Sequence, residues 1–407
     1  YETAAHEEAI NYEDEVVYPF GYGLSYTSFE QKFLSFEVNG NTAQATVEVK
    51  NTGTKAGKEV VQIYYGAPYT TEDKNHKVEK SSKNLIEFAK TSELEAGKSE
   101  IVTLEWTIDE MASYDYMRDN GDGTKGCYAL QPGEYTIYLG KDSHSWWEKK
   151  NWSLATAIYY DNSNPRQSEK DGQAKFDKEG NPTDTPEKSD IDSLAKFVAA
   201  TNQFQESSDF MNEAGMTLLT RQNMAGTLPT APTGEDFKLA DKYLANWNRE
   251  KRGGYDVQTN PITGNVPTSK VYSNEMPVVK NNGATLSALR GKGYYDQAWE
   301  DLLDQIDFNS SAVQEQLRDL LYYGAYNSAV LDCIGKPAVK DYDGPQGLSS
   351  FMDFSLDACA YVSEVVVAST WNKDLVEKYG EAIGQEGLTH GVTGWYGPAM
   401  NTHRTPF

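Results

Sequence analysis

The chain has 407 residues, 38% of them hydrophobic and 12% aromatic, and a net charge of −24. This length and composition are typical of a globular protein with roughly two or three domains. A surface this negative repels nucleic-acid phosphates and anionic lipid headgroups, so neither nucleic acid nor membrane is expected as a partner. No apolar run approaches the length that a bilayer span needs.

The three cysteines, Cys127, Cys333 and Cys359, are far apart in the chain and odd in number. They argue against a disulfide framework but leave a single bridge open, and they do not decide between a cytoplasmic and an exported bacterial protein. The chain begins without Met or a signal-peptide pattern and stops within a structural element. We therefore interpret both ends as cuts in a larger polypeptide.

Strand signals dominate residues 27–160, where apolar and polar residues alternate between turns rich in Gly, Asn, Thr and Pro. One such turn is "NTGTKAG" (51–57). The apolar positions expected to share a face are Ile101, Leu104, Trp106 and Ile108 in one strand and Tyr135, Ile137 and Leu139 in another. Short strands spaced about ten residues apart predict an antiparallel sandwich.

Residues 161–192 are polar, charged and nearly free of aliphatic side chains, which predicts an exposed connection. The stretch 193–290 is mixed, with helical patterns between joints rich in Pro, Gly and Thr. No tandem repeat is visible.

From residue 291 the apolar pattern becomes helical. Ser310 or Ser311 is a candidate N-cap of one helix, and a later helix is expected between an Asn372 cap and Gly391. The expected apolar face of that later helix comprises Leu375, Tyr379 and Ile383. The run "VSEVVVAST" fits either a buried strand or a helix end, and "VTGWYGPAMN" indicates a strand. A strand, a helix and a strand with short joints predict an α/β unit with parallel pairing.

Two groups of motifs resemble glycoside hydrolase family 3, the β-glucosidase and β-xylosidase family. "YPFGYGLSYTSFE", "VEVKNTGTKAGKEVVQIYY" and "LQPGEYTIYLG" are similar to its fibronectin type III-like domain. "IGKPAVKDYDGPQGL", "ASTWNKDLVEKYGEAIGQEG" and "GPAMNTHRTP" are similar to the opening of its (β/α)-barrel domain. The resemblance implies a multidomain fold in which an antiparallel β-sandwich precedes the first part of a TIM-type barrel.

This order resembles the permuted members of the family, in which an α/β sandwich domain comes first. The resemblance implies four segments. They are the exit from a preceding α/β sandwich domain (1–17), the fibronectin type III-like β-sandwich (18–160), a linker and connecting segment (161–290) and the N-terminal part of the barrel domain (291–407).

The stretch "KDYDGPQGLSSF" (340–351) indicates a turn when taken alone. In the family, the aspartate of the D-G-P motif binds hydroxyl groups of the non-reducing sugar, and this role falls on Asp343. A carboxylate suits it because charged acceptors bind more strongly than neutral ones and can accept two hydroxyls at once. The family motif usually ends in an arginine that also touches sugar, but Ser349 stands there. Asp341 is expected to be a solvated neighbour.

Arg404, in "NTHRTP", is the second substrate-binding candidate, set against a structural ion-pair or strand-end role. No residue of the chain is assigned as catalytic, since the family's nucleophilic aspartate and acid/base glutamate are expected outside it. No cofactor is implied. The five histidines show no metal-ligand spacing, so no metal site is predicted.

Two further motifs have simpler interpretations. "RDNGDGTKG" lacks the ligand spacing of a calcium loop and is interpreted as a turn. Trp146, Trp147 and Trp152 could stack on sugar, but packing against the sandwich or the linker is favoured.

The resemblance implies part of a retaining, exo-acting β-glycosidase that removes terminal non-reducing β-D-glucosyl residues and is inactive as this chain alone. Its partners would be a β-linked oligosaccharide or glucoside and the remaining domains of the same enzyme, with a homo-oligomer left open. The alternative is a non-catalytic carbohydrate-binding or cell-surface interaction protein built on the fibronectin-like module.

Overall fold

The structure, a computed structural model, describes residues 16–167, 214–223, 233–234, 237–238, 278–290, 292, 296–322, 326–350, 353 and 355–399. Of the predicted exposed connection (161–192), residues 168–192 lie outside the described residues. Arg404 also lies outside them.

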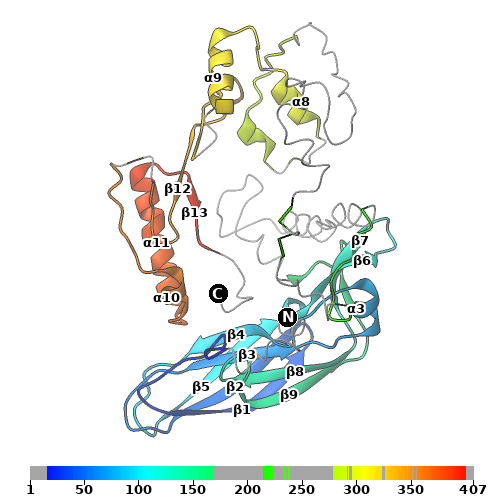
Figure 1. Ribbon diagram of the computed structural model, residues 1–407, viewed down its shortest axis with the longest axis vertical. Helices are drawn as coiled ribbons and strands as arrows, with labels where there is room; N and C mark the ends of the chain where they lie inside the picture. Colours follow the sequence, from blue (N-terminus) through cyan, green and yellow to red (C-terminus); the bar gives the residue numbers. More distant parts are fainter. Residues whose placement is uncertain are drawn as a thin grey trace.

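An antiparallel β-sandwich is formed by the first described segment, drawn in blue to green in Figure 1. One sheet has the strand order β1-β2-β5, and the other has the order β4-β3-β8-β9. The bounds are β1 Phe29–Asn39, β2 Thr42–Asn51, β3 Val60–Gly66, β4 Asn84–Lys90, β5 Ser99–Thr107, β8 Gly133–Gly140 and β9 Trp146–Leu154. The antiparallel sandwich predicted from strand spacing is confirmed, and the turn between β2 and β3 crosses from one sheet to the other.

A smaller sheet of order β10-β7-β6 adjoins the sandwich, and a short helix, α3, contacts β6. The bounds here are α3 Thr71–His76, the 3₁₀ turn η1 Ile108–Met111, β6 Ser113–Asp119, β7 Lys125–Leu130 and β10 Ile158–Tyr160. The motif interpreted as a turn joins β6 to β7, and there the Asp122 carboxylate accepts hydrogen bonds from the backbone N–H and the hydroxyl of Thr124.

The sandwich core follows the period-two rule for strands. In β2 every second residue faces inward, and Ala43, Ala45, Val47 and Val49 are fully buried. The predicted inward face of β8 is confirmed, because Tyr135, Ile137 and Leu139 are all buried. The expectation for Ile101 was wrong. Ile101 is 63% exposed and its neighbour Val102 is buried, since Val102 is in step with Leu104 and Trp106.

The tryptophans near the end of the sandwich belong to β9. Trp147 and Trp152 pack against the core, and the ring of Trp152 lies 5.2 Å from that of Tyr135. Trp146 is 41% exposed. The predicted packing role is thus confirmed for two of the three side chains.

The N-terminal segment covers the outer face of β3. The Gln62 amide donates to the carbonyl of Gly21, and the Tyr64 hydroxyl donates to Gln62. Gly21 has φ +85°, and a Cβ there would collide with the Gln62 and Tyr64 side chains. Only glycine therefore fits at this point of the "YPFGYG" motif.

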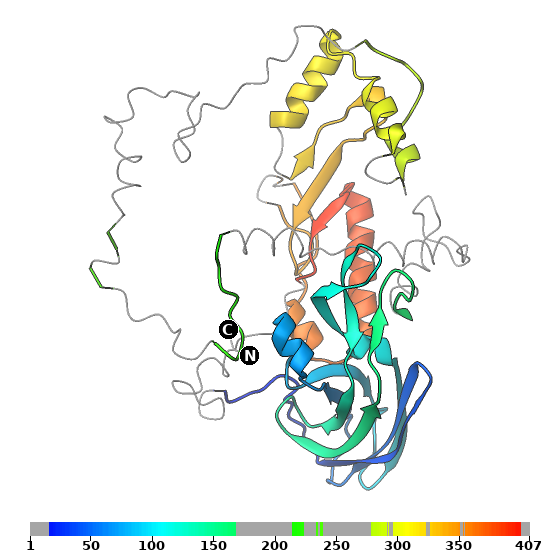
Figure 2. The ribbon, with the colours of Figure 1, turned by 90° about the vertical axis from the view of Figure 1, so that its right-hand side faces the viewer.

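The C-terminal part combines helices with a small sheet of order β11-β12-β13, drawn in yellow to red in Figures 1 and 2. The bounds are η2 Leu286–Leu289, α8 Gln297–Leu303, α9 Ser311–Tyr322, β11 Asn327–Ser328, η3 Asp332–Ile334, β12 Val339–Asp343, α10 Glu364–Ala368, α11 Lys373–His390 and β13 Gly394–Tyr396. The ambiguous run "VSEVVVAST" forms α10.

The caps of these helices agree with the sequence. The Ser310 hydroxyl accepts from the N–H of Val313 at the start of α9, and the Asn372 side chain accepts from Leu375 at the start of α11. Gly391 ends α11 with φ +64°. On the predicted apolar face of α11, Ile383 is buried, whereas Leu375 is 44% exposed.

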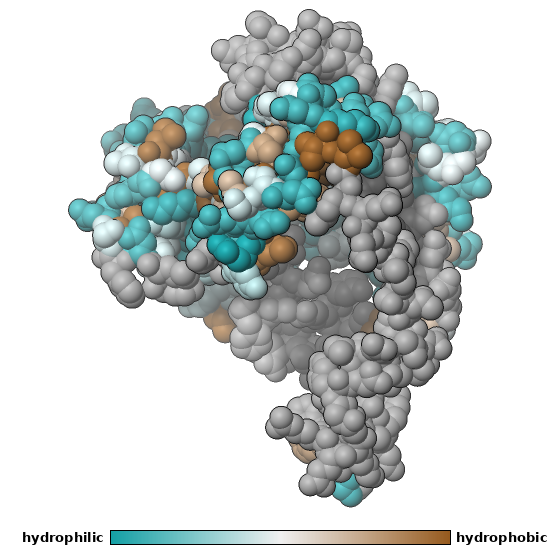
Figure 3. Space-filling model, turned by 90° about the horizontal axis from the view of Figure 1, so that it is seen from above, coloured by the Kyte–Doolittle hydropathy of each residue, from teal (hydrophilic) through white to brown (hydrophobic). Residues whose placement is uncertain are grey.

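Strands β12 and β13 pair in parallel, with α11 as their crossover, so the predicted strand–helix–strand unit is confirmed. The barrel itself is not seen, because the described residues show a single parallel strand pair. Large apolar side chains stay exposed on the helices, among them Leu321, Val365 and Leu388. From above, apolar surface appears as patches among hydrophilic side chains (Figure 3). None of the described helices is both long and apolar enough to cross a bilayer.

Candidate functional site

Asp343 is the last residue of β12, at the carboxyl end of the parallel strand pair. Tyr342 points to the opposite face of the strand, where it is buried in a cluster with Ile383 of α11 and Leu348. Because strand side chains alternate, Asp341 and Asp343 face away from α11. Half-buried Asp341 lies against Gly394 of β13, so the expectation of a solvated side chain was only partly right.

The turn after Asp343 depends on two glycines. Gly344 has φ +113° and Gly347 has φ +112°, values that residues with a Cβ rarely adopt. A Cβ on Gly344 would also collide with the carbonyl oxygen of Gly347, and one on Gly347 with that of Cys359. The D-G-P-x-G spacing is therefore required by the shape of the turn itself.

Three successive carbonyls of this turn accept hydrogen bonds from three other segments. The Trp395 indole of β13 donates to Gly344 at 2.7 Å, and the Tyr379 hydroxyl of α11 donates to Pro345 at 2.9 Å. The backbone N–H of Tyr361 donates to Gln346 at 2.8 Å. Peptide groups that are hydrogen-bonded in this way limit the conformations open to a loop, even where the loop is exposed, as at Pro345 and Gln346. The backbone that carries Asp343 is thus held from several sides.

The carboxylate of Asp343 is half-buried and lies beside two tyrosines. The Tyr326 hydroxyl donates to its Oδ2 at 2.7 Å, and the Tyr326 ring lies 5.5 Å from that of Tyr396. This hydrogen bond to the carboxylate, together with burial, raises the pKa of Tyr326, so its hydroxyl remains a donor. One accepted hydrogen bond leaves a carboxylate with further acceptor positions.

Tyr396 is paired with Asp343 in the β12–β13 register and is 57% exposed. An exposed ring next to a carboxylate is suited to a ligand with both C–H faces and hydroxyl groups, because the ring offers apolar surface and the carboxylate accepts hydrogen bonds. Neither Tyr326 nor Tyr396 was singled out from the sequence. For Tyr396, the signal was its place at the end of a predicted strand parallel to that of Asp343.

Backbone strain accompanies the site. Tyr326 has φ +60°, an uncommon value for a residue with a bulky side chain. Such conformations persist only where the surroundings enforce them, and they cluster at functional sites. At Tyr326, the hydrogen bond to Asp343 and the ring contact with Tyr396 stabilise this backbone conformation.

Ser349 is exposed, and its N–H donates to the carbonyl of Asp343 at 2.8 Å. Position 349, where the family motif carries arginine, therefore lies directly beside the Asp343 backbone. The serine side chain is too short to replace an arginine side chain in reach or in charge. Arg404 and its neighbour His403 lie outside the described residues.

The helix-facing side of β12 is held by polar contacts. The Tyr342 hydroxyl donates to Asp353, and the Lys340 ammonium lies 3.4 Å from the same carboxylate. Hydrogen bonds from Ser355 and Tyr342 lower the pKa of Asp353 well below its usual range. These contacts support the strand from the side opposite Asp343.

Other chemically suggestive features lie on the sandwich. Ligand atoms of Glu72, His76 and Asp115 lie within 4.8 Å of one another. The His76 ring nitrogen is 2.6 Å from Asp115, and Arg118 lies 3.6 Å from Glu72, so both carboxylates already have partners within the protein. Of the described cysteines, Cys127 is buried, Cys333 half-buried and Cys359 exposed, and all three are free.

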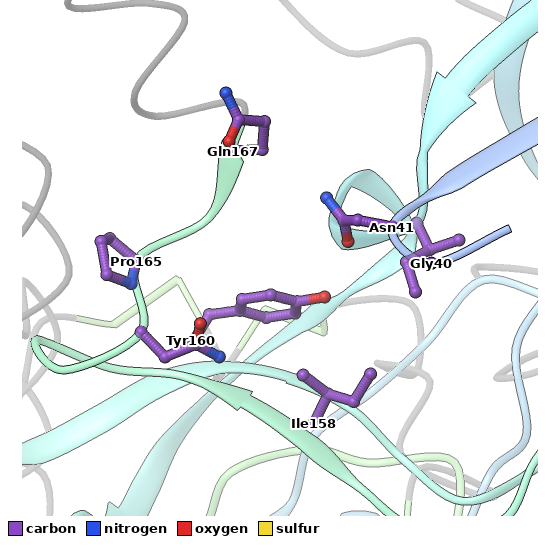
Figure 4. A pocket seen from close by; sticks show the side chains of 8 residues that line it. Gly40, Asn41, Ile158, Tyr160, Pro165 and Gln167 are labelled. Carbon is purple, nitrogen blue, oxygen red and sulfur yellow. The ribbon is translucent and has the colours of Figure 1, made fainter.

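A pocket of about 320 Å³ also lies on the sandwich (Figure 4). It is lined by Gly40, Asn41, Ile108, Ile158, Tyr160, Asn164, Pro165 and Gln167. This lining contains no carboxylate, so it offers no acid–base pair. The carboxylate of Asp343 and its neighbouring tyrosines make that site the stronger candidate.

Comparison with known proteins finds that the chain is similar to β-glucosidases. Residues 59–143 match the fibronectin type III-like domain. β-Glucosidase A of Butyrivibrio fibrisolvens is 26% identical over 97% of this chain and 42% of its own length, and β-glucosidase of Ruminococcus albus is 26% identical over 97% and 34%. A β-glucosidase structure from Paenibacillus barengoltzii, 22% identical, matches with a TM-score of 0.51 over 97% of this chain and 36% of its own.

The chain thus spans less than half the length of these relatives. The chain combines a fibronectin type III-like module with a parallel strand–helix–strand unit, the combination expected from the resemblance to glycoside hydrolase family 3. The resemblance to glycoside hydrolase family 3 is confirmed, and this chain is a relative of its β-glucosidases over nearly its whole length.

Proposed function

We propose that this chain is part of a retaining, exo-acting β-glycosidase that releases terminal non-reducing β-D-glucosyl residues. The observation that carries the proposal is the rigid D-G-P turn, which presents Asp343 beside Tyr326 and Tyr396 at the carboxyl end of a parallel strand pair. In α/β barrels, active sites lie at this end of the strands. The names of the relatives that match 97% of the chain support the same activity.

Within this proposal, Asp343 binds sugar hydroxyls and Arg404 is a second substrate contact. Retention requires two carboxyl groups about 5–5.5 Å apart, one a nucleophile and the other an acid that then acts as base. We assign both to parts of the enzyme outside residues 1–407. Asp343 would then contribute binding energy that grows as positive charge develops on the sugar ring.

The chain divides, in this proposal, into an exit from an α/β sandwich domain (1–17), the fibronectin-like sandwich (18–160), a connecting segment (161–290) and the start of a barrel (291–407). Val365 and Val366 on α10, 75% and 54% exposed, support the last assignment. Exposed apolar side chains in such numbers indicate a surface that other protein segments cover. Further strands and helices of a barrel are suitable partners for them.

The test compares the full-length protein with the 407-residue chain on aryl β-glucosides and β-xylosides. We expect hydrolysis by the full-length protein only, with a first-formed product that retains the β-configuration in proton NMR spectra. Binding of oligosaccharides without any hydrolysis would instead favour the non-catalytic carbohydrate-binding alternative. Turnover by the 407-residue chain above a heat-treated control would contradict our placement of the catalytic carboxyls.

A further inference from the structure

The link between α10 and α11 contacts the sandwich at strand β4. The Trp371 ring lies 5.0 Å from the Phe88 ring in an edge-to-face arrangement and 5.8 Å from the Phe20 ring of the N-terminal segment. Edge-to-face pairs at such distances are favourable beyond the area they bury. Phe20 and Phe88, from two segments of the sandwich region, thus form an aromatic cluster with Trp371 of the C-terminal part. Figures 1 and 2 both show α10 next to the sandwich.

Polar contacts are made by residues on both sides of Trp371 in the sequence, Thr370 and Lys373. The Lys373 ammonium lies 2.7 Å from the Glu87 carboxylate and 4.6 Å from the centre of the Phe88 ring. The Lys90 ammonium donates to the carbonyl of Thr370 at 2.6 Å. The contacts therefore involve Glu87, Phe88 and Lys90 along β4, which is an edge strand of its sheet.

The backbone at Trp371 indicates that its side chain has a role. Trp371 has φ +51°, a left-handed conformation that glycine adopts at little cost and a bulky residue does not. If this position served only to turn the chain from α10 into α11, glycine would be the better residue. The indole ring must compensate for the strain, and its partners are Phe20 and Phe88.

Contacts continue from Trp371 to the turn that follows Asp343. The next residue, Asn372, caps α11 through the N–H of Leu375. Two turns along the same helix, Tyr379 donates to the carbonyl of Pro345 at 2.9 Å, and Ile383 is buried against Tyr342. A shift of the start of α11 would therefore displace a donor to the D-G-P turn.

We propose that Trp371 is a positioning residue, held by the sandwich at Phe88 and Phe20, that fixes α11 and thereby the turn presenting Asp343. The fibronectin-like sandwich would in this way contribute to sugar binding without touching sugar. The expected effect on catalysis rests on the proposed function of Asp343. The effect on structure does not, because it concerns only Trp371, α11 and residues 344–347.

The first experiment measures amide hydrogen exchange in the full-length protein, with four variants. Trp371→Gly removes the ring but suits the left-handed backbone, and Phe88→Ala removes the partner from the sandwich side. We expect exchange in residues 343–349 to rise roughly tenfold in both, since two aromatic contacts are lost or weakened. Trp371→Phe should restore most of the protection. Trp146→Ala, which removes a half-exposed tryptophan on the opposite edge strand, should match the parent.

The second experiment measures hydrolysis of an aryl β-glucoside by the same variants and by Asp343→Ala. We expect kcat/KM to fall roughly tenfold in Trp371→Gly and Phe88→Ala, through a higher KM as well as a lower kcat, with Trp371→Phe near the parent. Exchange in Trp371→Gly within twofold of the parent would overturn the inference, whatever Asp343→Ala does. Full activity of Asp343→Ala would overturn the proposed function instead, and the exchange data would still decide whether Trp371 holds the turn.

Discussion

The hydroxyl of Tyr326 donates to Oδ2 of Asp343 at 2.7 Å, and this bond joins the most strained tyrosine of the candidate site to its carboxylate. The geometry sets the direction in which the carboxylate points. It also orients the Tyr326 ring against Tyr396, which forms the apolar side of the site.

Replacing Tyr326 by phenylalanine keeps the ring and removes the donor. A hydrogen bond to a charged group contributes about 1.5–3 kcal/mol, part of which water will replace, so kcat/KM of the full-length enzyme on an aryl β-glucoside should fall roughly tenfold. The melting temperature should change little. Tyr322→Phe, at a 77% exposed position in α9, is the matched control and should remain within twofold of the parent. Equal activity of the two variants would show that the bond has no part in catalysis.

Gly344 and Gly380 differ in what a methyl group would meet. At Gly344 a Cβ collides with backbone and the φ is +113°, whereas nothing lies within 4 Å at Gly380 on α11. Gly344→Ala should destabilise the C-terminal part by about 2 kcal/mol or more through strain and the lost turn. Gly380→Ala should stabilise it by about 0.5–1 kcal/mol. Chemical denaturation followed by fluorescence would measure both, and a Gly344→Ala protein as stable as Gly380→Ala would refute the turn geometry.

The adjacent residues Ile101 and Val102 test the register of β5. Val102 is buried and Ile101 is 63% exposed. Val102→Thr buries a hydroxyl and should cost about 1–3 kcal/mol of stability, while Ile101→Thr should stay within about 0.5 kcal/mol of the parent. Urea denaturation of the two variants is sufficient. A larger loss of stability in Ile101→Thr than in Val102→Thr would indicate that Ile101 is the buried residue, as first expected from the sequence.

Local patterns predicted the secondary structure well. The inward face of β8, the Asn372 cap and the Gly391 stop of α11 all follow from neighbours along the chain, and each is seen in the structure. Ile101 was misplaced because a single exposed apolar residue on an edge strand is ordinary and carries no signal of its own.

Contacts between distant segments could not be predicted in the same way. Tyr326 precedes the short strand β11 and has no sequence feature that points to Asp343. Trp371 contacts Phe88, although 283 positions of the chain (371 − 88) separate the two residues. The glycines of the D-G-P-x-G motif indicated a turn, but the donors to its three carbonyls come from β13, α11 and the segment before α10.

The most direct test of the account compares Asp343→Asn with Asp341→Asn in the full-length enzyme. Both carboxylates lie on the same face of β12, but only Asp343 is bonded to Tyr326 and stands at the strand's end. With an aryl β-glucoside, Asp343→Asn should lower kcat/KM by roughly 10²-fold, since charged hydrogen bonds that strengthen in the transition state are lost. Asp341→Asn should stay within about threefold. A folded Asp343→Asn enzyme within twofold of the parent would contradict the assignment of Asp343 to sugar binding.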